Sequence, residues 1–127
     1  MVGTKRTILI IEDNPDARDS LALVLSLEHY VVRLAATRDE GLEMLTLGEP
    51  DVVLLDWFMP GLELEEFVRR ALNLYPSLQV ILISASLNTQ KKAEELKLNW
   101  LGKPVEPADL LQKIDLCIQR RLRDNEL

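Results

Sequence analysis

The chain has 127 residues, of which 47% are hydrophobic and 28% charged, and its formal net charge at pH 7 is -6. A chain of this length can bury roughly two thirds of its unfolded surface, so we expect a single domain over residues 1–127. Direct binding of nucleic acid requires a basic face, which the acidic balance argues against. No apolar stretch approaches the roughly 18 residues that a membrane helix needs, which argues against a membrane protein.

The cellular compartment is judged from the one cysteine and from the N-terminal region. Cys117 cannot form an internal disulfide, which fits a reducing cytoplasm. It lies on an apolar helical stripe, so we interpret it as a small buried hydrophobe rather than a nucleophile. The first apolar run, residues 8–11, is too short for a signal peptide and leads directly into Glu12 and Asp13. The sequence therefore predicts a cytoplasmic protein.

The first half of the chain alternates between strand and helix patterns. A β-branched run at Thr7–Ile11 predicts a strand that ends in the polar loop of residues 12–15. Apolar residues at helical spacing continue to about Glu28, and residues 30–35 predict a second strand. Thr37, with Glu40 three positions later, has the form of a capping box and starts a short helix.

The stretch around Asp56 is the centre of the pattern. An apolar run, residues 52–55, ends in this carboxylate, and the turn Pro60-Gly61 follows. Such a run is typical of a strand that is buried on both faces in the middle of a parallel sheet. Asp56 then lies at the carboxyl end of a central strand, at the edge of the sheet where ligands bind in open α/β folds.

The second half continues the alternation, and the whole pattern predicts an α/β protein. Five strands and five helices in turn, without repeat or linker, favour a doubly wound parallel sheet with helices on both faces. The remaining expected elements are a helix that carries Leu64 to Leu72, a strand at residues 79–83, a polar helix at residues 89–98, a brief strand at residues 100–101, and a helix that begins at Pro107.

Five polar side chains follow the ends of these strands. Glu12 and Asp13 follow the first, Asp56 the third, Ser84 the fourth and Lys103 the fifth. Carboxylates crowded into one cleft repel each other, so they require protons or a cation. Oxygen ligands without nearby His or Cys favour Mg²⁺. The set predicts a phosphoryl-transfer site, in which Asp56 is the nucleophile, the metal and Lys103 neutralise charge, and Ser84 donates a hydrogen bond.

Each of these residues also has a simpler interpretation. Asp56 alone fits a turn residue, and the acidic pair before Asn14-Pro15 fits a helix start. A lysine such as Lys103 is by default a surface residue, and Ser84 fits a cap of the next helix. We favour the functional interpretation because all of the positions fall at one edge of the predicted sheet.

These residues resemble the motifs of response-regulator receiver domains in two-component signalling, over essentially the whole chain. The matching segments are residues 11–14, residues 54–61, Ser84-Ala85 and Lys103-Pro104, and their order makes the combination specific. The resemblance implies a single receiver domain over residues 1–127 with a flavodoxin-like sheet in the strand order 2-1-3-4-5.

The resemblance also implies roles in phosphorylation. Asp56 is expected to accept a phosphoryl group from a sensor histidine kinase, a phosphotransfer protein or a small phosphodonor. Asp13 and Asp56 are expected to ligate Mg²⁺ directly, Glu12 through water, and Phe58 through its backbone carbonyl. Lys103 is expected to contact the phosphoryl group and to precede a cis peptide bond, which X-Pro bonds adopt at modest cost.

The signalling part of the resemblance concerns Ser84 and Trp100, which match the family's switch residues. Trp100 also fits a simple core position, because a large aromatic beside an apolar strand is more often core than switch. The partner is expected to be an output protein or a second copy of the chain. A receiver is a phosphoacceptor with weak self-dephosphorylation rather than a conventional enzyme.

The chain departs from the family pattern in three places. Glu63-Leu64 replaces the usual Asp-Gly, the interval between Ser84 and Lys103 is shorter than usual, and Leu98-Asn99 replaces the usual Gly-Ala. The fourth helix is therefore expected to be short or displaced. This leaves a second function open, a receiver-like interaction module that works without phosphorylation. An aspartate-nucleophile phosphatase or a flavin-binding protein is less favoured, because the expected second acidic residue and phosphate loop are missing.

Overall fold

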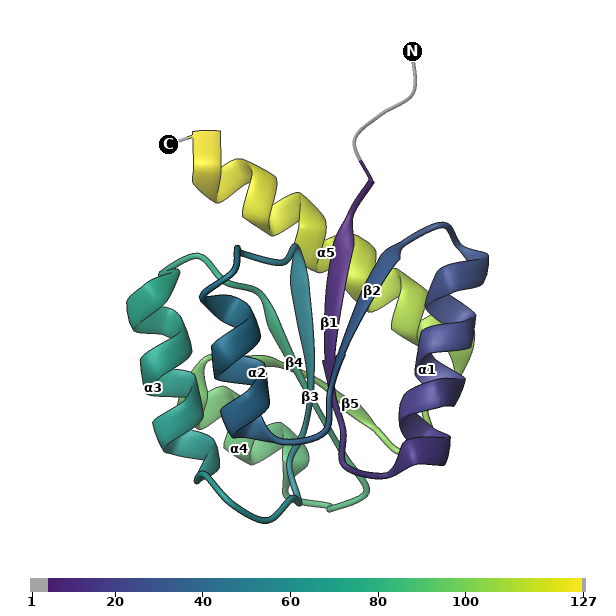
Figure 1. Cartoon of the computed structure of the whole chain (residues 1–127), viewed down its shortest axis with the longest axis vertical. Coiled ribbons are helices and arrows are strands. Elements are labelled where there is room, and N and C mark those ends of the chain that lie inside the picture. The colour runs from purple at the N-terminus through teal and green to yellow at the C-terminus, as the bar shows by residue number, and fades with distance from the viewer. Residues whose placement is uncertain (1–4, 127) are drawn as a thin grey trace.

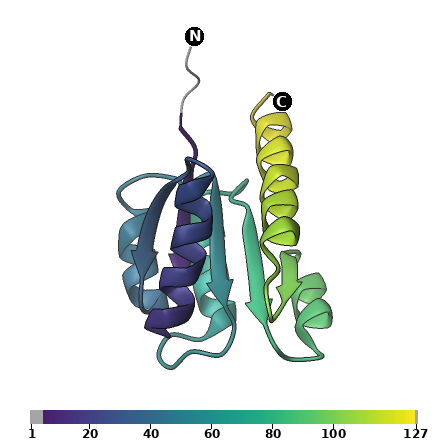
Figure 2. The same ribbon diagram turned by 90° about the vertical axis from the view of Figure 1, so that its right-hand side faces the viewer.

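The structure, a computed structural model, describes residues 5–126. Its five strands form one parallel sheet in the order β2-β1-β3-β4-β5, and their arrowheads point to the same lower edge in Figures 1 and 2. The strands are β1 (Thr7–Ile11), β2 (Val31–Ala35), β3 (Val52–Asp56), β4 (Val80–Ser84) and β5 (Asn99–Gly102). The helices are α1 (Pro15–Leu27), α2 (Arg38–Leu45), α3 (Leu64–Leu74), α4 (Thr89–Leu96) and α5 (Pro107–Glu126). The predicted fold class and strand order are confirmed.

Two apolar cores lie on opposite faces of the sheet. One core lies between the sheet and helices α1 and α5, and it includes Leu25 of α1 and Leu110 and Ile114 of α5. The other holds Leu45 of α2 and Phe67 of α3, together with side chains of α4. Every residue of β3 and β4 is buried. The central strands are therefore covered on both faces, as their continuous apolar runs predict.

The helix starts next to the candidate site follow the capping rules. The Asn14 side chain accepts a hydrogen bond of 2.9 Å from the Ala17 amide at the start of α1. Pro15 is the first residue of that helix, where its missing N–H costs nothing. The Thr37 hydroxyl accepts from the Glu40 amide at 3.0 Å, as the capping-box pattern predicts. These caps fix the direction in which the chain leaves the carboxyl ends of β1 and β2.

Helix α4 is short, and it ends two residues earlier than its sequence pattern predicts. Lys97 follows the helix in the left-handed conformation, with φ of 59°. The Leu98 amide then returns to the Ala93 carbonyl at 2.8 Å, which closes the last turn. A lysine in this conformation costs about 1 kcal/mol more than a glycine. The helix therefore stops at Leu96 although its polar, weakly amphipathic pattern continues.

Two further sequence expectations concern Cys117 and membrane-spanning helices. Cys117 of α5 is fully buried in the core that α5 shares with α1. This burial raises the pKa of its thiol to about 11. It is therefore an uncharged apolar side chain, as expected. Within residues 5–126, no helix combines the length and the apolar character that crossing a membrane requires.

Substitution of Phe67 tests how α3 packs against the sheet. Its side chain is fully buried among the strands and α2, so we expect Phe67→Ala to lower the free energy of unfolding by about 3–5 kcal/mol. Urea denaturation followed by circular dichroism measures this. Leu74→Ala on the same helix removes a side chain that is 47% exposed and is expected to change stability by less than about 0.5 kcal/mol. Equal losses in the two variants would contradict the assigned packing.

Candidate functional site

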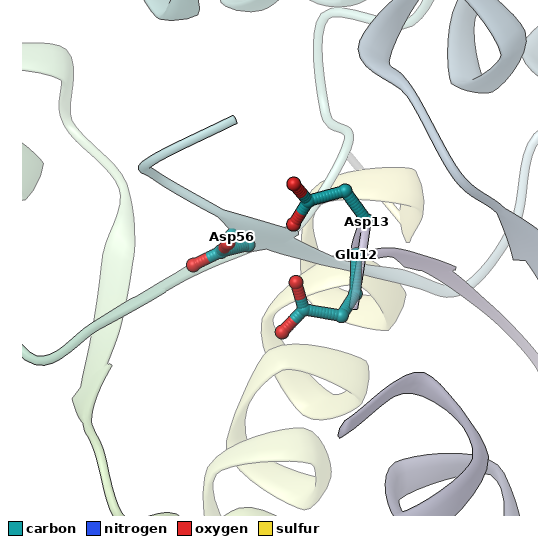
Figure 3. A group of neighbouring side chains, drawn as sticks. All are labelled: Glu12, Asp13 and Asp56. Atoms are coloured by element: carbon teal, nitrogen blue, oxygen red, sulfur yellow. The ribbon is translucent and has the colours of Figure 1, made fainter. Parts of the chain in front are cut away.

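Three carboxylates meet at the carboxyl ends of β1 and β3. The parallel register places Ile11 opposite Leu55, so Glu12 follows β1 beside Asp56. Each of Glu12, Asp13 and Asp56 offers a carboxylate oxygen, and these atoms lie within 4.8 Å of one another (Figure 3). Glu12 and Asp56 are buried, whereas Asp13 is exposed. The predicted acidic cluster therefore has one side open to solvent.

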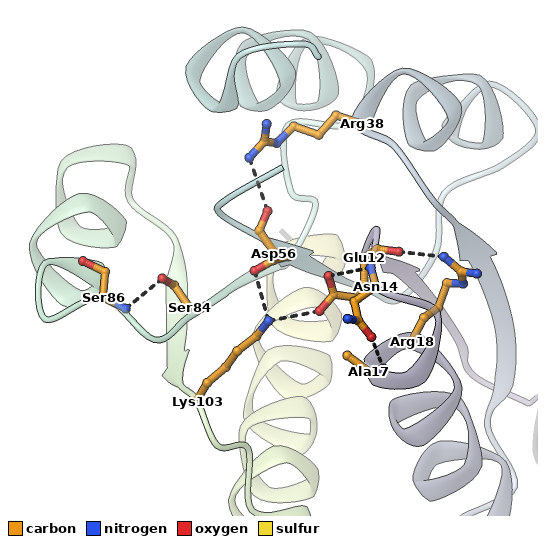
Figure 4. Close-up of polar contacts among 9 residues, drawn as sticks. All are labelled: Glu12, Asn14, Ala17, Arg18, Arg38, Asp56, Ser84, Ser86 and Lys103. Atoms are coloured by element: carbon orange, nitrogen blue, oxygen red, sulfur yellow. Dashed lines mark hydrogen bonds and ion pairs between the residues drawn. The ribbon is translucent and has the colours of Figure 1, made fainter. Parts of the chain in front are cut away.

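Lys103 supplies the cation that contacts this cluster. Its ammonium nitrogen lies 3.1 Å from Oε1 of Glu12 and 3.4 Å from Oδ1 of Asp56 (Figure 4). Its backbone amide donates to the Ser84 carbonyl at 2.9 Å, which extends the pairing between β4 and β5. The expected cis bond between Lys103 and Pro104 is present. Lys103 is thus exposed as a residue while its ammonium contacts both buried acids.

The two buried acids of the cluster have pKa values that are shifted in opposite directions. Burial raises the pKa of Asp56 to about 6, and the neighbouring charge of Glu12 adds to this effect. Burial also acts to raise the pKa of Glu12, but hydrogen bonds from Lys103 and from the Asn14 amide hold it below its ordinary value. The pKa of Lys103 is raised despite burial, because Glu12 and Asp56 favour its charged form. Near neutral pH the two buried acids, Glu12 and Asp56, are therefore mainly ionised beside the ammonium of Lys103.

This donor set fits a hard divalent cation. One ammonium leaves most of the negative charge of the cluster uncompensated, and its ligand atoms are all oxygen. Mg²⁺ prefers such ligands and keeps several waters, for which the exposed side at Asp13 leaves room. Glu12, Asp13 and Asp56 are the side chains that would hold it. Its chemistry here would be to neutralise negative charge on the oxygens of a bound phosphoryl group.

Ser84 lies at the end of the neighbouring strand β4 and is almost fully buried. Its hydroxyl oxygen accepts a 3.0 Å hydrogen bond from the Ser86 amide (Figure 4). This bond forms a local turn, and the residue that precedes α4 is Asn88. The interpretation of Ser84 as the cap of the next helix is therefore wrong. Its hydroxyl instead holds the chain in the loop that borders the cluster.

The aromatic side chains divide between the site loop and the core. Trp57 and Phe58 follow Asp56, and their rings stack with centroids 4.7 Å apart. The Phe58 side chain is 62% exposed. Lys92 of α4 lies over the Trp57 ring, with its ammonium 5.9 Å from the ring centroid. Trp100 is half-buried on β5 and packs against the core beneath α2, α3 and α4, so it has the contacts of a core residue in this conformation.

Two arginines contact the site segments and were not anticipated from the sequence. Arg18 of α1 donates to the Glu12 carbonyl at 3.0 Å, and Arg38 of α2 donates to the Asp56 carbonyl at 3.3 Å (Figure 4). An arginine in an early helical turn is normally solvent-exposed, and backbone carbonyls as partners leave no pattern in the sequence. No sequence signal marks either residue.

Comparisons with known proteins agree with the fold. The family model of the response regulator receiver domain matches residues 8–115. The phosphate regulon transcriptional regulatory protein PhoB of Pseudomonas aeruginosa is 27% identical over 94% of this chain and 54% of its own length. The response regulator MprA of Mycobacterium ulcerans is 30% identical over 94% of this chain and 53% of its own length. The chain thus spans about half the length of these two relatives.

A solved structure extends the likeness to three dimensions. The CheY-like response regulator receiver domain protein of Methanospirillum hungatei superposes with a TM-score of 0.86 at 29% identity, covering 95% of this chain and 99% of the other. The fold and its acidic edge define a flavodoxin-like α/β signalling domain. The chain belongs to the response regulator receiver domain family of two-component systems. This family consists of phosphoacceptor domains rather than conventional enzymes.

The raised pKa of Asp56 predicts how replacing this residue changes the stability of the fold at different pH values. Its pKa of about 6 exceeds the ordinary 3.8, so the ionised carboxylate destabilises the fold near neutral pH, and protonation relieves this as the pH falls below about 6. We expect Asp56→Asn to stabilise the metal-free protein near neutral pH by on the order of 1 kcal/mol. That gain should shrink progressively below about pH 6, as measured by thermal unfolding.

The control for this measurement is Asp19→Asn, which changes an exposed carboxylate on α1. It is expected to alter stability by less than about 0.5 kcal/mol at either pH. An Asp56→Asn variant that is less stable than the wild type near neutral pH would contradict the assigned electrostatics.

Proposed function

We propose that this chain is a phosphorylation-dependent receiver that accepts a phosphoryl group on Asp56. The observation that carries the proposal is the meeting of Glu12, Asp13, Asp56 and Lys103 at one edge of the sheet. A turn residue, a helix cap or a surface lysine has no reason to converge on this point with the other three. A site that forms an aspartyl phosphate requires a nucleophilic carboxylate, oxygen ligands for a cation and a positive side chain near one another.

In the proposed reaction, a carboxylate oxygen of Asp56 attacks the phosphorus of the donor. A phosphorus–oxygen bond forms while the bond between phosphorus and the donor's histidine nitrogen, or the oxygen of a small phosphodonor, breaks. The leaving group keeps the bonding electron pair. A histidine nitrogen that leaves takes a proton from solvent, whereas a carboxylate that leaves a small phosphodonor such as acetyl phosphate stays ionised. Because the pKa of Asp56 is about 6, the nucleophile is mostly ionised at neutral pH. Lys103, whose ammonium lies 3.4 Å from Oδ1 of Asp56, would contact an oxygen of the transferred group.

Mg²⁺ is the proposed cofactor. Asp13 and Asp56 would contact it directly, Glu12 through a water, and Phe58 through its backbone carbonyl. The support for this assignment is the clustered carboxylate oxygens and the position of Phe58 two residues beyond Asp56 in the loop after β3. The bulky and exposed Phe58 ring beside the site would hinder attacking water, which would slow loss of the phosphoryl group by the weak self-dephosphorylation.

The proposed partner on the input side is a sensor histidine kinase or a phosphotransfer protein. On the output side we propose a protein partner, an output domain of the same regulator or a second copy of the chain, with no direct contact to nucleic acid or membrane. The support is family membership and the length of the relatives, of which this chain covers about half. Residues 1–127 would act as one receiver unit in the cytoplasm. Ser84 and Trp100 are the proposed switch residues.

Incubation with acetyl phosphate tests the phosphoacceptor role. With Mg²⁺ present, we expect intact mass spectrometry to detect one added phosphoryl group in the wild type and none in Asp56→Asn. Removal of the metal with a chelator is expected to abolish the addition. Lys103→Met should sharply reduce it, because no other side chain brings a cation to both Glu12 and Asp56 in the part of the chain that the structure describes.

The control is Lys91→Met, which removes an exposed lysine of α4 and is expected to leave the addition unchanged. Addition that persists in Asp56→Asn would place the acceptor elsewhere. A folded wild type that takes up no phosphoryl group with Mg²⁺ would overturn the proposal. That result would favour a receiver-like interaction module that works without phosphorylation, which the short α4 and its left-handed end at Lys97 would then explain.

A further inference from the structure

Arg38 has an unusual environment for a charged residue. It is the first residue of α2, and only 3% of its surface is exposed. Its side chain points toward Asp56 and the loop that follows it rather than into solvent (Figure 4). A buried charge is costly unless its hydrogen bonds are satisfied. The contacts of this guanidinium therefore require a specific explanation.

The guanidinium is surrounded by backbone carbonyls of that loop. Nη1 donates to the Leu62 carbonyl at 2.7 Å and to the Met59 carbonyl at 3.4 Å. Nη2 donates to the Asp56 carbonyl at 3.3 Å and to the Trp57 carbonyl. Four carbonyls between Asp56 and Leu62 thus converge on one side chain. Because hydrogen bonds to a charged group are stronger than neutral ones, this side chain holds the whole loop in one conformation.

The held carbonyls lie on both sides of Phe58. Peptide units are planar, so fixing a carbonyl fixes the orientation of the unit that contains it. The peptide unit that carries the Phe58 carbonyl lies between the units of Trp57 and Met59, whose carbonyls both contact Arg38. The Phe58 carbonyl is not among those that Arg38 contacts. Its direction is therefore constrained by the two neighbouring peptide units, and Arg38 does not occupy its oxygen.

We propose that Arg38 is a positioning residue for the metal site, which sets the loop after β3 so that the Phe58 carbonyl faces a cation held by Glu12, Asp13 and Asp56. This inference rests on the proposed function, because it assumes that the acidic cluster binds Mg²⁺. Outer partners that orient metal ligands typically contribute a factor of roughly 10 to 100 in metal affinity. Arg38 is expected to act in this range without touching the metal.

A charge effect alone predicts the opposite sign, which makes the inference testable. Arg38 is positive and lies near the cluster, so its charge repels Mg²⁺. Removing that charge without any loss of loop geometry would therefore tighten metal binding. Arg38→Lys keeps the charge but cannot reach four carbonyls with one compact ammonium. Arg38→Gln loses both the charge and most of the hydrogen bonds.

The experiment is a calorimetric titration of the metal-free protein with Mg²⁺, carried out well below the thermal midpoint of each variant. We expect both Arg38→Lys and Arg38→Gln to bind Mg²⁺ at least about 10-fold more weakly than the wild type. The matched control is Arg69→Gln, which removes an exposed arginine of α3 that pairs only with Glu66 among the described residues. The control is expected to bind as the wild type does. A purely structural role would lower the thermal midpoint but leave the affinity of the folded protein unchanged.

Amide hydrogen exchange over residues 57–62 provides a second measurement that needs no metal. Loss of the guanidinium is expected to accelerate exchange in this loop in both Arg38 variants, with α5 unaffected. Should neither variant fold, nitrogen NMR of the wild type replaces them. The guanidinium N–H groups of Arg38 are then expected to exchange much more slowly than those of Arg69. Comparable fast exchange at both arginines would overturn the inference.

The outcomes separate this inference from the proposed function. A wild type that binds no Mg²⁺ would overturn the proposed function, and the metal role of Arg38 with it. Wild-type binding with unchanged or tighter affinity in both Arg38 variants would overturn the inference alone. Weaker binding in Arg38→Gln with wild-type affinity in Arg38→Lys would show that the contact of the guanidinium with four carbonyls is not needed for metal binding, which also overturns it.

Discussion

The concentration of negative charge at one edge of the sheet is the constraint on which the rest of the structure depends. Glu12 and Asp56 are buried beside each other, Asp13 adds a third carboxylate, and Lys103 is the cation in contact with the buried pair. Burial and the like charge of Glu12 both oppose ionisation of Asp56, and together they raise its pKa. The protein folds despite this cost because apolar packing in the two cores stabilises the native state.

The topology brings these charges together without long loops. The chain leaves β1 for β2 at one side of the sheet and crosses to β3 on the other side of β1, so the strand order reverses at this point. Helix α1 consequently packs on one face, and α2 and α3 pack on the opposite face. The loops that follow β1 and β3 leave adjacent strand ends in different directions, and ligands bind at this position in folds of this type.

The fold and the charged cluster could be predicted from the sequence because both follow from local patterns. Continuous apolar runs mark the strands, and Glu12, Asp13, Asp56 and Lys103 each follow a strand end within a few residues. The end of α4 could not be predicted, since it depends on Lys97 adopting a left-handed conformation that lysine rarely takes. The loop contacts of Arg38 could not be predicted either, because backbone carbonyls 18 to 24 residues away leave no trace in residue types.

The two arginines near the site explain how the cluster keeps its charge. Arg18 and Arg38 both reach the segments that carry the buried acids, yet both donate to the backbone carbonyls of Glu12 and Asp56 rather than to their carboxylates (Figure 4). An arginine bound to a carboxylate would neutralise it and occupy its oxygens in a bidentate pair. Bound to the main chain, the arginines instead brace each loop and leave the carboxylate oxygens to Lys103 and to a cation. A metal site needs both rigid positioning and uncompensated negative charge. In Glu12 and Asp56 the backbone carbonyls provide the first, and the side-chain carboxylates provide the second.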